Sequence, residues 1–382
     1  MKRISLVVAL LFALPLLPVR GQAVELDLAG KSALLMDVAT GTVLYESNAH
    51  ERLAPASVTK VMTMLLIMEA IDSGKIGWED TVTASEAAAA KGGSQVYLKV
   101  GETMTVTDML KSIAVSSAND CACAMAEHIA GAESAFVTMM NEKARELGMN
   151  DTHFVNCTGL DDGENASEHK TSAHDIALMS RELLKNHPDI KKFTTIWMDT
   201  IRSGTFGLSN TNKLVRFYQG ATGLKTGFTS GAGYCLSATA QREGMELIAV
   251  VMGAETSPAR NAACKSLLDY GFANFAVVNP ELTEAEPIPV KMGEIASVDA
   301  RLSGSGGLLI DKAKKNSVTM ELQVEPFVTA PVSQGQRVGT LTVKAGEQPL
   351  GEIPLVAAQA VERLTFHDLF LTVLKRAAMA KM

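Results

Sequence analysis

The sequence predicts an α+β protein with a large mixed domain, a small all-β domain and an amphipathic helix at the C-terminus. Strand signals fall at the two ends of the large domain, in residues 33–46 and 223–254, and helical periodicity fills most of the space between them. This arrangement indicates one sheet that is closed by N-terminal and C-terminal strands. Residues 288–358 change character, because short strand-like runs alternate there with glycine-rich turns.

The N-terminus and the composition indicate an exported globular protein. Lys2 and Arg3 precede an apolar run over residues 4–17, and Gly21-Gln22-Ala23 offers a small-x-small cleavage site. This pattern predicts a signal peptide over 1–23 rather than an uncleaved membrane anchor. The 382 residues are 47% hydrophobic and 20% charged, as in ordinary globular proteins. A formal net charge of −7 disfavours nucleic acid as a partner.

The elements of the first domain, 24–277, follow from local patterns. Two apolar runs, 32–37 and 42–46, flank a turn at Thr40-Gly41 and predict a β-hairpin. Residues 61–70 are apolar almost all round, without glycine or proline, and predict a buried helix. Thr107 is expected to cap a helix over 107–115. Further helices are predicted over 84–91, 119–130, 134–147 and 260–275, and strands over 222–226, 233–241 and 245–253.

Two further segments follow a linker rich in proline and glutamate around residues 279–289. Residues 284–360 are expected to form the all-β domain, and they carry no catalytic constellation, so a spacer or an interaction module is favoured. In 361–382 an apolar stripe with helical spacing ends in basic residues. Two interpretations compete, a helix packed on its own domain and an in-plane membrane anchor, and the terminal position favours the anchor.

The cysteines do not predict a disulfide framework or a metal site. There are five, an odd number, and they are spread widely: Cys121, Cys123, Cys157, Cys235 and Cys264. Cys121 and Cys123 lie two apart on a predicted helix and therefore point to different faces. Buried thiols are favoured, and neither a metal nor another cofactor is expected.

The first candidate catalytic motif is Ser57-Val58-Thr59-Lys60, at the start of the predicted helix over 61–70. Serine is a preferred helix cap, and residues three apart share a face, so Lys60 is expected beside the Ser57 hydroxyl. A lysine with a depressed pKa can take the proton of a serine and activate it as a nucleophile. Burial and a second cation, Lys225, are expected to lower the pKa of Lys60. The alternative is a capped helix with a solvated lysine.

Two later motifs complete the first. Ser117-Ala118-Asn119 falls between two predicted helices, where a hydroxyl can relay protons and an amide can hold a substrate amide. Lys225-Thr226-Gly227 falls on a predicted strand, where a cation and a hydroxyl suit a carboxylate, and Gly227 is expected to admit a ligand backbone. Each triplet alone is near chance frequency, but the three in this order form a strong combined signal.

With these motifs the sequence resembles the penicillin-binding-protein and serine β-lactamase superfamily, and within it the D-alanyl-D-alanine carboxypeptidases of low molecular mass. The resemblance covers nearly the whole mature chain and includes further segments: Asn156 with Gly159-Leu160, Thr171 to Asp175, Asn210 to Lys213, and Tyr270-Gly271-Phe272. It implies an antiparallel sheet with helices on both faces, a C-terminal β-domain and a membrane-anchoring tail. An enzyme at the outer face of the bacterial cytoplasmic membrane is therefore expected.

The resemblance also implies roles for the motif residues. Ser57 would attack the bond between the two terminal D-alanines of a peptidoglycan stem peptide, with Lys60 as its base and Ser117 as proton donor to the leaving D-alanine. Substrate-binding residues would be Asn119 for an amide, Lys225, Thr226 and Gly227 at the terminal carboxylate, and Phe228, whose backbone N–H would join that of Ser57 in the oxyanion hole. β-Lactam antibiotics would acylate Ser57. Phe228 departs from members that carry His after Lys-Thr-Gly, which leaves the substrate preference open.

Weaker candidates and other functions remain open. Arg260 and Arg216 are candidates for carboxylate binding, with a surface arginine at a helix start as the alternative for Arg260. Structural or surface roles are favoured for the histidines and for Asp175; the histidines concerned are His153, His169 and His174. A β-lactamase is disfavoured because Glu164-Asn165 lacks the Glu-x-x-x-Asn spacing. A D,D-endopeptidase would use the same site, and an inactive binding homologue would predict broken motifs.

Overall fold

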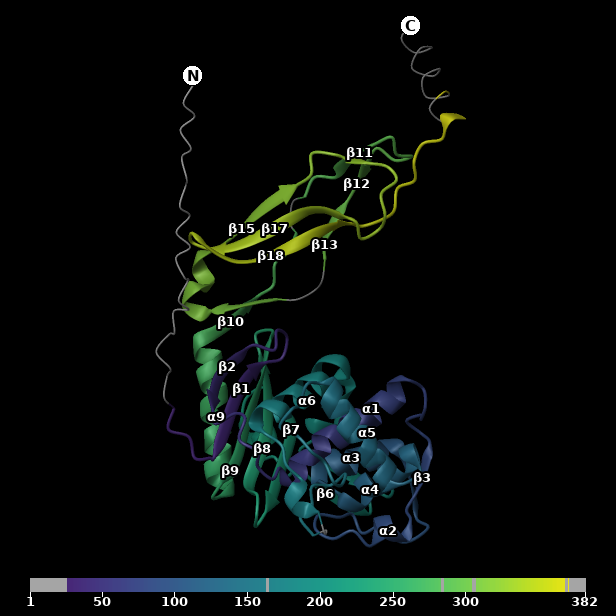
Figure 1. The fold of residues 1–382 in the computed structure, drawn as a ribbon, viewed down its shortest axis with the longest axis vertical. Coiled ribbons are helices and arrows are strands. Elements are labelled where there is room, and N and C mark those ends of the chain that lie inside the picture. Colours follow the sequence, from purple (N-terminus) through teal and green to yellow (C-terminus); the bar gives the residue numbers. More distant parts are fainter. Residues whose placement is uncertain (1–25, 163–164, 283–284, 304–306, 368–369, 371–382) are drawn as a thin grey trace, which may run out of the picture.

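The computed structural model describes residues 26–162, 165–282, 285–303, 307–367 and 370. Figure 1 shows a larger lobe, which contains a sheet and most of the helices, and a smaller lobe of strands beyond the end of α9 (Ser257–Asn274). The predicted signal peptide, 1–23, and most of the predicted terminal helix, 361–382, lie outside the described residues. No helix in the described ranges is long and apolar enough to span a membrane.

The larger lobe is organised around an antiparallel sheet that has five strands in the described chain, in the order β2-β1-β9-β8-β7. The N-terminal strand β1 lies beside the C-terminal strand β9, with Leu35 opposite Ala249. The predicted closure of one sheet by strands from both ends of the domain is therefore confirmed. The strands are β1 (Ser32–Asp37), β2 (Val43–Ser47), β7 (Ala221–Thr229), β8 (Gly233–Arg242) and β9 (Met245–Ala254).

Helices cover both faces of this sheet, as the resemblance implied. Successive residues of a strand point to opposite faces, so β1 sends Leu34 into one apolar core and Leu35 into another. The Leu35 core is closed by α9, and the larger Leu34 core by most of the other helices. These are α1 (Lys60–Asp72), α3 (Val106–Ser116), α4 (Asn119–Ala130), α5 (Glu133–Glu146) and α6 (Ala173–Asn186).

Short elements connect these layers. They are α2 (Glu86–Ala89), α7 (Lys191–Thr194), α8 (Leu214–Phe217), and the strand pairs β3 (Thr81–Thr83) with β4 (Thr103–Thr105) and β5 (Met198–Ile201) with β6 (Phe206–Ser209). The helix predicted over 84–91 is thus only a single turn. The predicted cap of α3 was wrong: Thr105, not Thr107, accepts the N–H of Asp108. Both threonines precede the apolar stripe, and only Thr105 has the extended backbone that a cap requires.

The smaller lobe consists of strands and one 3₁₀ helix, η4 (Lys312–Ser317), in the residues described, and an apolar core that includes Val338 and Leu355 holds it together. Its strands form the orders β13-β18-β17-β15 and β12-β11-β16, and β14 pairs with β10 at the end of α9. The bounds are β10 (Phe275–Val278), β11 (Ile288–Lys291), β12 (Ser297–Val298), β13 (Ala300–Leu302), β14 (Leu308–Asp311), β15 (Val318–Val324), β16 (Val328–Thr329), β17 (Arg337–Ala345) and β18 (Gln348–Ala357).

Candidate active site

Ser57 lies in a short 3₁₀ helix, η1 (Ala56–Thr59), that leads directly into α1. The prediction that the Ser57 side chain caps a helix was wrong, because Pro55 holds the cap position. Instead Ser57 Oγ accepts a hydrogen bond from Lys60 Nζ at 2.9 Å. Side chains at i and i+3 eclipse in a 3₁₀ helix, and this geometry brings the two groups together as the spacing predicted.

Lys60 is completely buried, with 0% of its surface exposed. Its Nζ also donates to the carbonyl oxygen of Thr158 at 2.9 Å. Burial lowers the pKa of Lys60 from 10.5 to about 7, although the nearby Cys157 and Asp120 act in the opposite direction. A large fraction of Lys60 is therefore neutral at pH 7 and able to accept a proton.

Lys225 on β7 is buried as well, and its Nζ donates to the carbonyl oxygen of Thr226 at 2.9 Å. Burial first, and then repulsion from Lys60 and Arg260, hold the pKa of Lys225 well below 10.5. The predicted electrostatic repulsion between Lys60 and Lys225 therefore exists, but it lowers the pKa of Lys225, whereas burial lowers the pKa of Lys60. An anion that entered beside Lys225 would favour the charged ammonium form.

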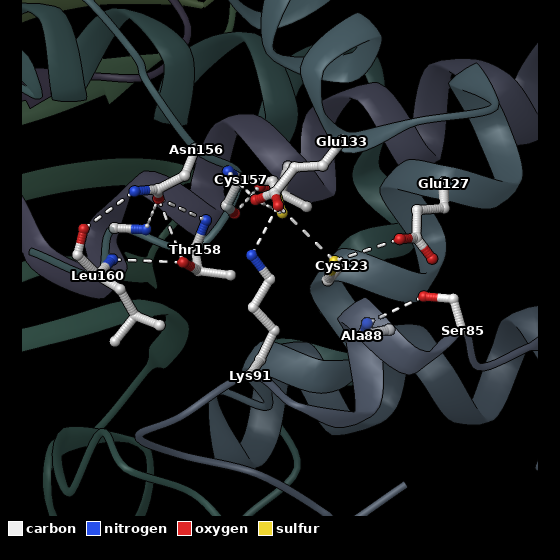
Figure 2. Close-up of polar contacts among 12 residues, drawn as sticks. Ser85, Ala88, Lys91, Cys123, Glu127, Glu133, Asn156, Cys157, Thr158 and Leu160 are labelled. Carbon is white, nitrogen blue, oxygen red and sulfur yellow. Dashed lines mark hydrogen bonds and ion pairs between the residues drawn. The ribbon is translucent and has the colours of Figure 1, made fainter. Parts of the chain in front are cut away.

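The turn that holds the Thr158 carbonyl was not found by reasoning from motifs. Asn156 Oδ1 accepts the N–H groups of Thr158 and Gly159 at 3.1 and 2.7 Å, and Asn156 Nδ2 donates to the carbonyl oxygen of Leu160 (Figure 2). Gly159 has a φ of +81°, and a Cβ there would lie 1.8 Å from the Ala56 carbonyl oxygen. Asn followed three residues later by Gly was the available signal for such a turn.

Ser117 and Asn119 stand at the junction between α3 and α4. Ser117 ends α3 with a left-handed φ of 64° and is 3% exposed, and its hydroxyl makes no hydrogen bond to Ser57 or Lys60 among the residues that the structure describes. Asn119 Nδ2 donates to the carbonyl oxygen of Gly92 at 2.7 Å. Asn119 Oδ1 is buried without a partner in the described chain, so an incoming N–H group would satisfy it.

Thr226 is linked to the Ser117 region through residue 211. Its hydroxyl donates to Thr211 Oγ1 at 2.7 Å, and the Thr211 N–H donates to the carbonyl oxygen of Val115, two residues before Ser117. These bonds tie the edge strand β7 to the end of α3. The second and third motifs are therefore connected through a segment that neither motif contains.

Gly227 lies directly against the backbone that carries Ser57. A Cβ at this position would lie 2.6 Å from the Pro55 carbonyl oxygen and 3.1 Å from the Ser57 nitrogen. Glycine therefore lets η1 pack directly against β7, which sets the Ser57 backbone beside the edge of the sheet. Phe228 follows on the same strand, 53% exposed, and its ring stacks on Tyr234 at 4.3 Å.

The weaker candidates have structural contacts. Arg260 is 4% exposed and donates to the Cys235 carbonyl oxygen and to Ser257 Oγ, which excludes the alternative of a surface arginine. The charge of Arg260 contributes to the lowered pKa of Lys225. Arg216 is exposed in α8.

The histidines and Asp175 are not needed as bases. His169 is buried and hydrogen-bonds Thr59 Oγ1 and the N–H of Val155. Asp175 accepts the N–H of Asp151 and the hydroxyl of Thr152, which confirms a structural role. His153 is exposed, and His174 stacks on His50. Glu164 lies outside the described residues.

Metal ligands do not gather at Ser57 in the described ranges. One group of potential ligands, Glu69, Glu182 and His187, lies near the C-terminal ends of α1 and α6. Glu69 is already paired with Lys143. All five cysteines are buried and free, as predicted.

Comparison with known proteins agrees with this geometry. Residues 20–256 match the family model of D-alanyl-D-alanine carboxypeptidase, and residues 281–363 match that of the penicillin-binding protein 5 C-terminal domain. The chain is 44% identical over 359 residues to the D-alanyl-D-alanine carboxypeptidase DacF of Bacillus subtilis (strain 168), an alignment that covers 92% of this chain and 90% of the relative.

Solved structures show the same fold. Penicillin-binding protein 5 of Haemophilus influenzae superposes with a TM-score of 0.72 at 30% identity, over 89% of this chain and 99% of that one. The ampicillin-bound penicillin-binding protein D2 of Listeria monocytogenes gives a TM-score of 0.60 at 32% identity, over 65% of this chain and 99% of that one. By sequence, fold and the match over most of its length, this chain belongs to the D-alanyl-D-alanine carboxypeptidase family.

Proposed function

We propose that this protein is a serine-type D-alanyl-D-alanine carboxypeptidase that removes the terminal D-alanine from peptidoglycan stem pentapeptides through an acyl-enzyme on Ser57. The observation that carries the proposal is the hydrogen bond of 2.9 Å between Lys60 Nζ and Ser57 Oγ, made by a lysine whose pKa burial lowers to about 7. A neutral amine in contact with a hydroxyl is the arrangement that a general base and its nucleophile require.

Three side chains hold the substrate in this proposal, those of Asn119, Lys225 and Thr226. Asn119 Oδ1, which is buried and unpartnered among the described residues, accepts an amide N–H of the stem peptide. Lys225 and Thr226 bind the terminal carboxylate, and the approaching anion restores the charge of Lys225. Two different parts of the substrate are thereby positioned on either side of Ser57.

The reaction then proceeds in two halves. Ser57 Oγ attacks the carbonyl carbon between the two D-alanines while its proton passes to Lys60, and the N–H groups of Ser57 and Phe228 stabilise the oxyanion. The C–N bond breaks, Ser117 passes a proton to the departing D-alanine, and the proton held by Lys60 replaces it on Ser117. Water next attacks the ester, and its proton passes through the neutral Lys60 to Ser57 Oγ as the ester bond breaks and the shortened peptide leaves. β-Lactams enter the first half and remain bound as the acyl-enzyme.

Labelled penicillin tests the nucleophile. Wild-type protein is expected to gain one covalent label on Ser57, and Ser57→Ala is expected to gain none. Ser134→Ala, an exposed serine on α5, is the matched control and is expected to label as the wild type does. The absence of an adduct on folded wild-type protein would overturn the proposal.

Product assays separate the related activities. Release of free D-alanine from a pentapeptide without turnover of the β-lactam supports a carboxypeptidase, and rapid β-lactam turnover would indicate a β-lactamase instead. Cleavage of cross-linked dimeric peptides would add a D,D-endopeptidase activity at the same site. An inactive binding homologue would bind the pentapeptide without releasing D-alanine.

The site of action is proposed to be the outer face of the cytoplasmic membrane, after export directed by 1–23 and with 361–382 lying on the membrane surface. Support comes from the apolar stripe of this segment, of which Phe366 and Phe370 are 86% and 54% exposed. Deletion from residue 366 onward is expected to move the protein from the membrane fraction to the soluble fraction. Unchanged fractionation would favour a helix packed on its own domain.

A further inference from the structure

Two cysteines from distant parts of the chain share one carboxylate beside the candidate active site. Cys157 Sγ and its backbone N–H both lie 3.2 Å from Glu133 Oε1, and Cys123 Sγ lies 3.8 Å from Glu133 Oε2 (Figure 2). Lys91 Nζ holds the same carboxylate at 2.6 Å. The carboxylate of Glu133 thus brings together a thiol from α4 and a thiol from the turn that precedes Thr158.

The two thiols also interact with each other, and both are 0% exposed and unbonded. Interaction with the Cys123 side chain and burial raise the pKa of the Cys157 thiol well above 9.0, so this thiol is protonated at neutral pH. A buried thiol pair stays reduced until it meets an oxidant during a local opening.

The position of the pair connects it to the catalytic machinery. Cys157 directly precedes Thr158, whose carbonyl oxygen accepts the hydrogen bond of Lys60, and the Cys157 carbonyl oxygen accepts that of Thr63 at 2.6 Å. Cys123 lies one helical turn after Asn119 on α4. A bond between the two sulfurs would therefore join the segment that holds Lys60 to the helix that presents Asn119.

A route to the thiols is visible on one side. The side chains of Lys91 and Glu133 are 24% and 22% exposed, so the ion pair that covers the thiols is reached by solvent. Lys91 also lines a cavity of about 410 Å³ together with Asn156 and Thr158, which flank Cys157. The route expected for a reagent runs from this cavity past Lys91 to Glu133, whose carboxylate contacts both sulfurs.

We propose that Cys123 and Cys157 are a modification site, a thiol pair that closes to a reversible disulfide and thereby slows acylation of Ser57. The oxidant is a disulfide compound, such as oxidised glutathione. One cysteine loses its proton and attacks the reagent disulfide, which releases one reagent thiol; the second cysteine attacks the mixed disulfide and releases the other. Two protein thiols are oxidised, and one reagent disulfide is reduced to two thiols.

The effect on catalysis rests on the proposed function, whereas formation of the disulfide does not. The disulfide draws the residue before Thr158 toward α4 and removes both S–H donors from Glu133. The Thr158 carbonyl then no longer lies where Lys60 Nζ needs it. Loss of one hydrogen bond to an amine of this kind corresponds to about a tenfold slower acylation.

The experiment compares reduced protein with protein treated with oxidised glutathione. Mass spectrometry identifies the linked peptides, and labelled penicillin gives the acylation rate of the same samples. No lysine or arginine lies between Lys111 and Lys143, so trypsin leaves Cys121 and Cys123 on one peptide, and fragmentation between them places the link. Cys157→Ser is the test variant, and Cys264→Ser, which removes a buried thiol on α9, is the matched control.

The expected result is a link between Cys123 and Cys157, acylation about tenfold slower, and full recovery with a reductant. Cys157→Ser should lose the response to oxidation, and Cys264→Ser should keep it. Oxidised wild-type protein without the link, or with the link and an unchanged acylation rate, overturns the inference, and neither result depends on the folding of a variant. Failure of reduced wild-type protein to acylate at all would instead count against the proposed function.

Discussion

Acylation of Ser57 by penicillin is expected to rise with pH through a midpoint near 7. In the proposed mechanism Lys60 accepts the Ser57 proton only when it is neutral, and burial lowers the pKa of Lys60 from 10.5 to about 7. At pH 7 about half of the molecules then carry a neutral Lys60, against about one in 3000 for a lysine that titrates at 10.5. The difference in pKa corresponds to about 5 kcal/mol between the two protonation states.

The assay is the second-order rate constant for labelling by fluorescent penicillin between about pH 5 and 9. Relative to the plateau above the midpoint, we expect about a tenfold slower rate at pH 6 and about a hundredfold slower rate at pH 5. Circular dichroism over the same range shows whether the fold persists, and label hydrolysis without enzyme is subtracted.

Nuclear magnetic resonance of protein with ¹³C-labelled lysine reads the same titration directly. Lys60→Arg identifies the Lys60 resonance and separates it from that of Lys225, whose pKa burial also lowers. A Lys60 midpoint near the solvated value of about 10.4 would refute the reasoning. A rate that stays flat between pH 5 and 8 would refute it as well.

Three further outcomes are expected. Asn119→Ala should slow acylation by about 10- to 100-fold with an unchanged pH midpoint, because the unpartnered Oδ1 is lost; acylation within twofold of the wild type would contradict that role. Gly227→Ala should lower both the melting temperature and the acylation rate, because the new Cβ would lie 2.6 Å from the Pro55 carbonyl oxygen. Gly231→Ala is the control and should leave both unchanged, because its Cβ would lie 3.6 Å from the nearest atom. Burial holds the pKa of His169 at about 4, below its ordinary 6.5, so the unfolded chain takes up the proton at a higher pH than the folded chain does. The free energy of unfolding should therefore be at its full value above pH 6.5 and fall by about 3 kcal/mol as the pH drops to 4. Urea unfolding measures this loss, which should be smaller in His169→Gln.

The local elements were predicted well where a pattern extends over several turns. The helix predicted over 119–130 is α4 to the residue, and the strand predicted over 32–37 is β1. Predictions failed at the ends of elements, as at Thr105, because a cap depends on the backbone conformation of one residue and not on a repeated pattern. The terminal helix stays a prediction, since most of 361–382 lies outside the described residues.

The sequence predicted the motif residues of the candidate site, but not the hydrogen bonds and close contacts that hold these residues in place. Gly159 packs against Ala56 and Thr211 bonds Val115, in each case about 100 positions away, and no local pattern reports such partners. Asn156 bonds within its own turn, and the bond from Lys60 to Thr158 connects that turn to the candidate site. At Gly227 the close approach of η1 to β7 was not predicted, because it is a property of the packed domain.

By itself the sequence determined which residue types stand at the start of a helix, at a helix junction and on a strand, because capping, periodicity and turn chemistry act over a few neighbouring residues. It therefore identified Ser57 and Lys60 as a candidate nucleophile and base. Only the tertiary structure decided that burial lowers the pKa of Lys60 to about 7, that Asn119 keeps a free acceptor in the described chain, and that Cys123 and Cys157 share the carboxylate of Glu133. Desolvation and contact between distant segments exist only once the chain is packed, and they are what set the chemistry of this site.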